Sequence, residues 1–426
     1  MFKVKYNFLV LFQIVFSILN ATLLINMYGV SAESDAYLLS CSILVVLQLI
    51  LTMPIFQFIP FYNDYKNKSI KKSQDFYNFL FMFSLTYGVI VCLFLYFNLD
   101  LLIKIFTLNI DVSRLLILKK LLIISIWGSM FYTIVEINTQ LLNAEMNFSL
   151  PYILNTIPNA CVVFVQLLSI YFHTKNIYLL AYGQAISMMI SAIIGSFYIY
   201  KTLIKFRFVF KFEKIFDFIK NSISMQFGNS IYHIFFPIIL NNFLVTTPQG
   251  TVSCFYYAKK VIDILNSFAL GPSVRILRSK IAKAYSKLQI HSIEEYTRYY
   301  ICLSIVLFAV GIVFTYFVQV PVLKLVSNNK LTLSELSFIQ KIFISLTPWY
   351  FFMMIENPYV LINIMSKKSH IITLINSSFI VICATIIFLT SGYFNIYVIG
   401  IATAIAQFMN FVLHKKYARK ILNSFF

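Results

Sequence analysis

The sequence predicts an all-α, polytopic membrane protein with about twelve transmembrane helices arranged in two six-helix halves. The first observation is composition: of 426 residues, 60% are hydrophobic and only 12% are charged, and the mean hydropathy is +0.82. The second is that apolar runs of about 20 residues, the length that crosses a bilayer as a helix, recur from end to end. Because these runs are continuous rather than alternating, a membrane β-barrel is excluded.

Twelve apolar runs are expected to span the membrane. The first follows Lys3 and Lys5 in the manner of a signal peptide, but it is long and lacks a small-residue cleavage site. Since many more spans follow it, it is predicted to remain as the first helix. The predicted spans are roughly residues 7–29, 35–60, 77–98, 116–140, 151–172, 177–200, 222–245, 252–272, 298–319, 337–362, 370–391 and 394–413.

The positions of the basic residues predict that both ends of the chain are cytoplasmic. With the N-terminus inside, most of the 34 lysines and arginines fall in cytoplasmic segments, as the positive-inside rule requires. The net charge of +19 is therefore explained by topology, and no nucleic-acid partner is predicted. The predicted outside loops hold only Lys104, Arg114, Lys175, Lys324 and Lys330.

The predicted inside loop at residues 201–221 follows the sixth span and divides the chain. It interleaves basic residues with phenylalanines, a pattern typical of a segment lying on an anionic membrane surface. The predicted organisation is an N-terminal six-helix lobe (1–205), a basic-aromatic cytoplasmic linker (206–221) and a C-terminal six-helix lobe (222–426). A second long inside loop is predicted at 273–297.

A weak internal similarity supports two parallel repeats. Asn143 to Ser149 follow the fourth span, and Asn363 to Ser369 follow the tenth at the same place in the second half. An asparagine lies near the start of the apolar run that comes next in each half (Asn155 and Asn376). Parallel repeats of this kind are common in transporters.

The predicted eighth span carries charges well inside it. Gly250 to Pro272 is about the length of a membrane-spanning helix, yet it contains Lys259, Lys260 and Asp263. A charge at that depth costs roughly 2.5–3.5 kcal/mol on insertion scales, so it normally faces a partner or a water-filled cavity. Asp263 is one turn beyond the lysines and can pair with one of them. The remaining positive charge favours an anionic cargo.

Few other ionisable side chains are expected within the spans. Glu136 is predicted toward the inner end of the fourth span and Glu356 in the inner half of the tenth. Each is a candidate for ion or proton coupling, or a structural partner of a nearby lysine. Lys119 and Lys120 lie near the outer end of the fourth span, where they either extend to the interface or line a cationic cavity.

The sequence gives no indication of catalysis, of a cofactor or of a metal site. It holds only 11 glycines and no GxxxxGK[ST] phosphate-binding loop, and none of its six cysteines has metal-ligand spacing. A membrane glycosyltransferase or polymerase usually carries a long, charged outside loop. The longest predicted outside loops here, 99–115 and 320–336, are short.

Several motifs in order resemble polysaccharide-lipid flippases. Gly29-Val-Ser-Ala-Glu-Ser-Asp-Ala-Tyr37 leads into the second span, and Leu142-Asn-Ala-Glu-Met-Asn-Phe-Ser-Leu-Pro151 follows the fourth. Gly250-Thr-Val-Ser253 and then Tyr257-Ala-Lys-Lys260 mark the eighth. Together they are similar to the O-antigen flippases (Wzx) and the related lipid II flippases (MurJ/MviN) of the multidrug/oligosaccharidyl-lipid/polysaccharide exporter superfamily.

This resemblance implies two six-helix lobes around a central cavity, in the bacterial inner (plasma) membrane. It implies a flippase that moves an undecaprenyl-pyrophosphate-linked oligosaccharide, an O-antigen (lipopolysaccharide) or capsule repeat unit, from the cytoplasmic to the periplasmic leaflet by alternating access. Membrane lipids, and the polymerase and chain-length regulator of the same pathway, are the other partners it implies.

The family motifs also assign residues. The small-residue–Asp–Ala–aromatic pattern places its acidic position at Asp35, and the Tyr-Ala-x-Arg pattern of lipid II flippases places its cationic position at Lys260. The chain departs from the lipid II type in having twelve predicted spans rather than fourteen, and no arginine in its first two helices. Both departures favour the O-antigen or capsule type.

Two alternatives stay open. A multidrug or cation antiporter of the same superfamily would favour acidic cavity residues, and a membrane-embedded polysaccharide polymerase would favour long outside loops. For the flippase, the predicted cationic cavity consists of Lys260, Lys259, Lys119 and Lys120, and the predicted coupling or structural acids are Asp35, Asp263, Glu136 and Glu356.

Overall fold

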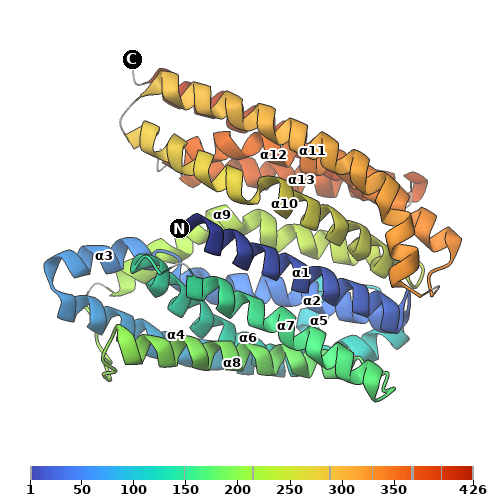
Figure 1. Ribbon diagram of the computed structural model, residues 1–426, viewed down its shortest axis with the longest axis horizontal. Coiled ribbons are helices and arrows are strands. Elements are labelled where there is room, and N and C mark those ends of the chain that lie inside the picture. The colour runs from blue at the N-terminus through green and yellow to red at the C-terminus, as the bar shows by residue number, and fades with distance from the viewer. Residues whose placement is uncertain are drawn as a thin grey trace. The chain divides into compact units, whose positions relative to one another are not determined.

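Within the part of the chain that the computed structural model describes, every regular element is a helix (Figure 1). The description covers the whole chain apart from residues 1, 148, 214, 287–288, 329, 366–368, 395 and 425–426. The predicted all-α class is therefore confirmed. The last residues of the predicted repeat motif at 366–368 lie outside the described residues.

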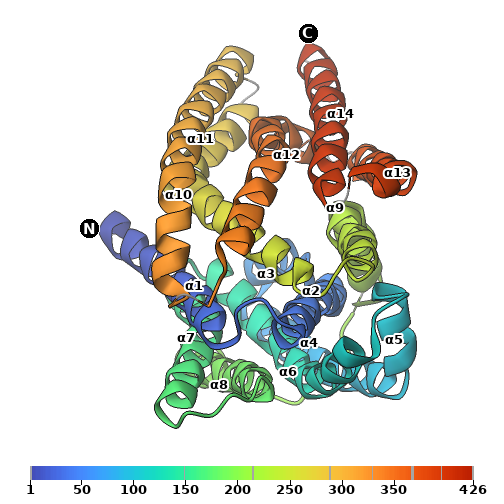
Figure 2. The same cartoon turned by 90° about the vertical axis from the view of Figure 1, so that its right-hand side faces the viewer.

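The chain divides into two compact units, Met1–Phe227 and Gly228–Phe426, and the division falls inside helix α9. Figures 1 and 2 show the long helices of both units. Unit 1 holds α1 (Phe2–Tyr28), α2 (Ala32–Thr52), η1 (Met53–Ile55), α3 (Phe58–Lys68), α4 (Ile70–Phe97), α5 (Leu99–Phe106), α6 (Val112–Ala144), α7 (Ser149–Tyr171) and α8 (Tyr178–Thr202). α9 (Ile215–Leu244) leads into unit 2, which continues with α10 (Thr251–Ser286), α11 (Ile290–Val326), α12 (Leu333–Met365), α13 (Ser369–Phe394) and α14 (Tyr397–Asn423).

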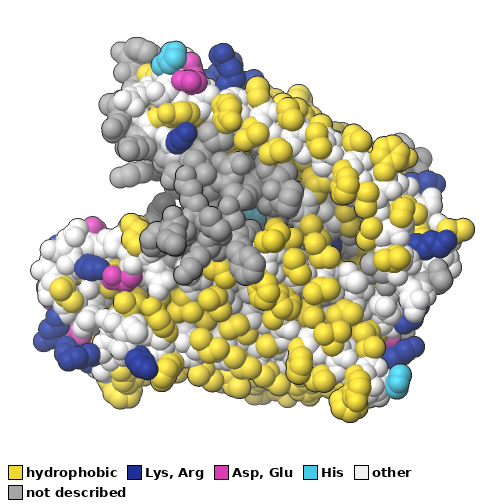
Figure 3. Space-filling view, in the orientation of Figure 1, with side chains coloured by type: hydrophobic (Ala, Val, Ile, Leu, Met, Phe, Trp, Pro, Cys, Tyr) yellow, Lys and Arg dark blue, Asp and Glu magenta, His cyan; other side chains and the backbone are white. Residues whose placement is uncertain are grey.

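Ten helical stretches among the described residues are long and apolar enough to cross a membrane, which confirms a multi-pass membrane protein. The other two predicted spans correspond to α9, whose apolar stretch is the shorter Ser230–Leu244, and to the charged α10. On the face drawn in Figure 3, hydrophobic side chains cover the middle of the helices, and Lys and Arg gather near helix ends. This distribution is the one expected of helices with their flanks in lipid.

Several predicted helix ends are wrong because hydropathy falls off before the helix does. The predicted inside loop 273–297 is mostly helical, since α10 continues to Ser286 and α11 begins at Ile290. Lysine, arginine and alanine are good helix formers, so a helix continues through them after it leaves the apolar layer. The predicted outside loop 99–115 is also largely helical: it holds α5, a short helix with Leu99, Leu102, Ile103 and Phe106 buried, and the first turn of α6.

The predicted second span is broken at a proline. α2 ends at Thr52, and Pro54 lies in the short 3-10 helix η1 before α3 begins. Proline donates no backbone hydrogen bond and its ring clashes with the preceding turn, so an α-helix does not continue through it easily. The break lets the chain change direction within the run that hydropathy treats as continuous.

In each unit, a glycine brings two helices into backbone contact. A Cβ added to Gly128 on α6 would lie 2.7 Å from the Cα of Ala185 on α8. A Cβ added to Gly400 on α14 would overlap the backbone of Ser345 on α12. Small residues at such positions let membrane helices pack closely where the hydrophobic effect gives little drive for association. We call these contacts the glycine seams.

We expect Gly400→Ala to destabilise unit 2 by about 1–3 kcal/mol, the usual range for overpacking. The reason is that the new methyl group meets backbone atoms of Ser345, which cannot rotate away. Thermal unfolding of the full chain in detergent measures the effect. Gly311→Ala is the matched control, because its Cβ would meet the flexible end of the Leu265 side chain at 3.1 Å. Equal destabilisation by both substitutions would contradict the seam.

Candidate functional site

Asp35, the acidic position of the second-span motif, lies in the first turn of α2 and is completely buried. A reciprocal cap begins this helix: the Ser34 amide donates to Ser31 Oγ (3.2 Å), and the Ser31 amide donates to Ser34 Oγ (3.0 Å). The cap satisfies amide groups that the first turn leaves without helical partners. The positive end of the helix dipole also favours a carboxylate at this place.

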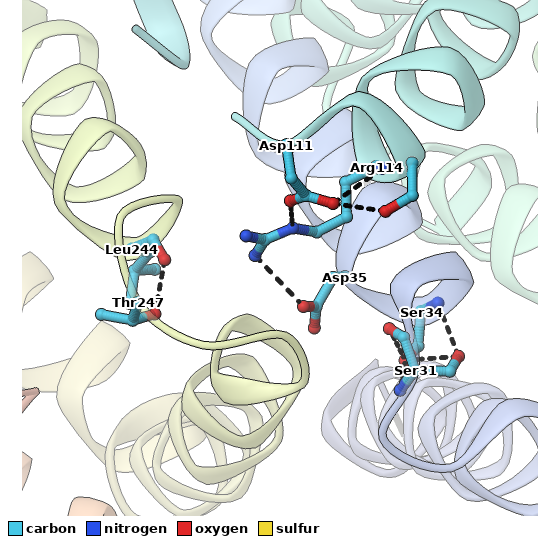
Figure 4. A network of polar contacts seen from close by, with 8 residues as sticks. Ser31, Ser34, Asp35, Asp111, Arg114, Leu244 and Thr247 are labelled. Carbon is cyan, nitrogen blue, oxygen red and sulfur yellow. Dashed lines mark hydrogen bonds and ion pairs between the residues drawn. The ribbon is translucent and has the colours of Figure 1, made fainter. Parts of the chain in front are cut away.

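Arg114 is the cation that faces Asp35, and the sequence did not predict it (Figure 4). It lies on the first turn of α6, is 4% exposed, and its Nη1 is 3.5 Å from Asp35 Oδ2. Its Nε donates to Asp111, which also accepts from the Arg114 backbone amide (3.3 Å) and so caps α6. The sequence placed Arg114 in an outside loop. The sequence did hold one sign of such a partner: Asp35 lies in the predicted second span, and a carboxylate within a span needs a cationic or polar partner.

Asp111 lies just before α6 and is held as a carboxylate. Partial burial raises its pKa, but the hydrogen bonds from Ser113 and Arg114 and the charge of Arg114 outweigh burial, so the net pKa is lowered. A depressed native pKa means that the carboxylate stabilises the fold above the unfolded pKa of about 3.9. That stabilisation is lost as pH falls through the native pKa.

We therefore expect the melting temperature of the protein to fall on acidification below about pH 4, and Asp111→Asn to remove part of that fall. Differential scanning fluorimetry of the detergent-solubilised protein across this range measures it. Asp100→Asn is the control, since the side chain of Asp100 is 80% exposed and pairs with Lys119 at the surface. Identical pH profiles for Asp111→Asn and the unmodified protein would refute the assignment.

Lys119 and Lys120 lie on α6 near the Arg114 end, and both have neighbours of their own. Lys119 Nζ is 2.6 Å from Asp100 Oδ1 on α5, and both side chains are well exposed. Lys120 Nζ lies 5.7 Å from the ring centroid of Tyr178 at the start of α8. A contact with substrate for these two lysines stays a prediction.

Glu136 has a local partner on its own helix. Its Oε1 accepts a 2.6 Å hydrogen bond from Gln140 Nε2, one turn further along α6, and the residue is half-buried. An amide one turn away is a neutral partner, in place of the lysine considered from the sequence. A coupling role for Glu136 stays a prediction.

In unit 2, Gly250 begins the segment that carries the central charges. Its φ of 90° is a left-handed conformation that side-chain-bearing residues rarely adopt, and α10 starts at the next residue. Gly29, before α2, also has a positive φ, at 56°. Each of the two glycines therefore forms the turn directly before a helix that carries a motif residue, Asp35 on α2 and Lys260 on α10; the parallel repeat stays a prediction.

The charges of α10 are arranged around Asp263. Of the two possible lysine pairings, the structure shows Lys259, whose Nζ is 2.7 Å from Asp263 Oδ2. Tyr350 on α12 donates to Asp263 Oδ1 at 2.5 Å, which ties α10 to α12. Lys260 is the next residue and is half-buried. We call Asp263, Lys259, Lys260 and Tyr350 the α10 cluster.

Glu356 forms a buried network between α12 and α14. Its Oε2 accepts a hydrogen bond from Gln407 Nε2, and its Oε1 lies 3.3 Å from His414 Nε2. The amide of Asn363 lies 2.9 Å from His414 Nδ1, so Nδ1 accepts and the ring proton is on Nε2, directed at Glu356. The lysine partner considered for Glu356 is thus replaced by an amide and an imidazole.

His414 escaped prediction because the last span was expected to end at residue 413. α14 instead runs to Asn423, and Thr403, Gln407, Asn410 and His414 are all buried along one of its faces. Their spacing of four, three and four residues is the helical repeat, and it was the available indication of a polar face.

The family comparison covers nearly the whole chain. The sequence profile of a family described as lipid II flippase MurJ matches residues 24–425. A search of curated proteins finds no match.

The fold is shared with solved transporters. A lipid II flippase MurJ in an inward closed conformation superposes with a TM-score of 0.78 at 16% identity, covering 98% of this chain and 87% of the other. An inward-facing multidrug resistance MATE family transporter of the MOP superfamily gives 0.78 at 12% identity, covering 96% and 95%. A MOP superfamily transporter from Pyrococcus furiosus, whose binding pocket has reverse polarity, gives 0.71 at 12% identity, covering 99% and 95%.

Proposed function

We propose that this chain, which belongs to the lipid II flippase MurJ family, flips an undecaprenyl-pyrophosphate-linked oligosaccharide from the cytoplasmic to the periplasmic leaflet. The proposed cargo is an O-antigen or capsule repeat unit, and the proposed location is the bacterial inner membrane with both chain ends cytoplasmic. Alternating access of two lobes to a central cavity is the proposed mechanism, and the pathway's polymerase and chain-length regulator are the proposed partners.

The observation that carries this proposal is the charge of the α10 cluster. Lys259, Lys260 and Asp263 together carry one more positive than negative charge within a helix of a transporter. A pyrophosphate headgroup leaving water needs such a compensating charge, because burying an unpaired anion is unfavourable. A cation antiporter would need the opposite excess.

Two sequence features favour an O-antigen or capsule repeat unit over lipid II as the cargo. The cationic position of α10 is Lys260, a compact charge with weaker directional grip than the arginine of the lipid II pattern. Residues 2–68, which include the first two membrane segments, contain no arginine. Both features fit transient contact with a varied sugar diphosphate.

A complementation assay tests the proposal. The gene is supplied, with the genes that assemble its sugar, to a strain lacking its own polysaccharide flippase, and the lipid-linked oligosaccharide on each leaflet is measured. We expect the intermediate to accumulate on the inner leaflet without the gene and to be cleared when it is added. An intermediate that reaches the outer leaflet without the gene but stays unpolymerised would instead identify a polymerase.

Glu356 is the proposed coupling acid, because it is buried and held between two helices by Gln407 and His414. We expect Glu356→Gln to fold normally, because the amide oxygen still accepts from His414 and Gln407 can turn its own amide so that its oxygen accepts from the new NH2 group. We expect it to transport at a rate that no longer depends on a proton or sodium gradient. Proteoliposome transport with and without each gradient measures this. Glu136→Gln is the comparison and should keep the dependence; the reverse outcome would assign coupling to Glu136.

A further inference from the structure

The chain between α8 and α9 carries a row of exposed phenylalanines. From residue 204 to residue 212 the chain is not helical. Phe206, Phe208 and Phe210 are 45%, 66% and 78% exposed. Each ring contacts the next: the ring centroids are 4.9 Å apart for Phe206 and Phe208, and 6.3 Å apart for Phe208 and Phe210. We call these three residues the Phe ladder.

The ladder is exposed even though its segment is firmly attached to unit 1. Asn78 Nδ2 on α4 donates to the Lys205 carbonyl oxygen at 3.0 Å, and Arg207 Nη1 lies 3.8 Å from Asp75 Oδ1, also on α4. Phe212, just after the ladder, packs on Tyr65 and Phe76 with centroid distances of 5.0 Å and 5.3 Å. Because both ends are held, the three rings project from a fixed position. Contiguous exposed apolar surface of this kind marks a contact with another apolar phase or partner.

The charged residues of the ladder segment itself are all positive, and one of them, Arg207, faces Asp75 on α4. Lys201, Lys205, Arg207 and Lys211 fall within the same twelve residues, and residues 199–212 include no aspartate or glutamate. Lys201, Lys205 and Lys211 are exposed. Aromatic rings beside several cations match the boundary between acyl chains and anionic headgroups, where cations are attracted to the negative surface.

An apolar groove of about 630 Å³ lies next to the ladder on unit 1. It is formed by α4, α6 and α8, is lined by Phe81, Phe131, Ile193 and Phe197, and includes Tyr200 and Lys201 at the end of α8. The Tyr200 ring contacts the Phe206 ring at 5.2 Å, so the groove and the ladder are continuous. A groove with this lining suits a hydrocarbon chain rather than a sugar.

We propose that the groove, Lys201 and the Phe ladder bind an anionic phospholipid of the adjoining leaflet. One acyl chain lies in the groove, its phosphate is near Lys201, and the ladder inserts at the headgroup boundary while Lys205 and Lys211 meet neighbouring headgroups. The occupant is a phospholipid because the groove lies on membrane-spanning helices and has charge only at its end. This site is separate from the α10 cluster and does not depend on the identity of the transported substrate.

Tryptophan fluorescence of the full chain in nanodiscs tests the proposal. The variant is Phe208→Trp, and the unsubstituted protein supplies the background of Trp127 and Trp349. In phosphatidylglycerol nanodiscs with brominated acyl chains, we expect strong quenching at position 208 and protection from aqueous acrylamide. Quenching should be at least about twofold weaker in brominated phosphatidylcholine, and should fall with added salt. Acrylamide quenching without bromolipid quenching would place the ladder in water and overturn the proposal.

Two further measurements identify the site and its occupant. Adding Lys201→Gln and Lys205→Gln should remove the preference for phosphatidylglycerol, whereas Lys415→Gln with Lys416→Gln, which removes two charges from the end of α14, should leave it intact. Equal loss in both pairs would mean that total charge and not this site decides, against the proposal. Displacement of the bromolipid by undecaprenyl phosphate at a small fraction of its concentration would show a polyprenyl lipid as the occupant and would also overturn it.

Discussion

Lys260→Ala is expected to abolish surface polysaccharide while the protein stays in the membrane at its normal level. Lys260 lies beside the Lys259–Asp263 pair on α10, and its removal leaves that turn of helix without its excess positive charge. A hydrogen bond to a charged group is worth about 1.5–3 kcal/mol, which corresponds to a transport rate lower by roughly one to two orders of magnitude. Lys260→Arg keeps the charge and should retain most of the activity.

The measurement is surface polysaccharide per unit of membrane-inserted protein in the complemented strain. Lys324→Ala, which removes an exposed lysine from α11, is the control and should behave as the unsubstituted protein does. Lys259→Ala differs from Lys260→Ala because it breaks the ion pair to Asp263, so it should lower thermal stability as well. Normal polysaccharide in a well-expressed Lys260→Ala strain would remove the main support for an anionic cargo.

The second large effect is expected in unit 1, at the buried ion pair between Asp35 and Arg114. Arg114→Met should destabilise the protein by about 3–5 kcal/mol, the usual penalty for leaving a buried partner charge uncompensated. Asp35 is fully buried and Arg114 is 4% exposed, so water cannot replace the lost guanidinium easily. The melting temperature of the purified full chain measures the loss.

A double-mutant cycle isolates the ion pair from the packing of its side chains. Asp35→Asn removes the buried charge, so Arg114→Met added to it should cost less than Arg114→Met alone. Arg114→Lys should rescue poorly, because lysine cannot donate to Asp111 and Asp35 from a planar fork. Strictly additive effects of the two substitutions would show that Asp35 and Arg114 do not stabilise each other.

The parts of the structure that the sequence predicted are those set by local spacing. Apolar runs located the helices, and the four-residue spacing of Lys259 and Asp263 allowed the ion pair that forms. The stretch that begins at Gly250 was predicted as a charged helix, and α10 starts at the next residue. Each of these features depends on residues that are close together in the sequence.

The parts that were missed depend on packing between distant segments. Arg114 and Asp35 are 79 residues apart, and Asn363 and His414 are 51 apart. Nothing in a single sequence pairs such residues, because many helix arrangements satisfy the same hydropathy. Helix ends were missed for another reason: α10 and α14 extend well beyond their apolar stretches, where helix propensity and not hydrophobicity sustains the backbone.

The glycine seams also set the stiffness of each unit. At Gly128 and Gly400 the two helices meet without an intervening side chain, so we expect each pair to move as one rigid body. Spin labels placed on the two helices of a seam should therefore keep a constant separation through the transport cycle. Such a pair gives a fixed reference from which the displacement of every other helix in the same unit can be measured.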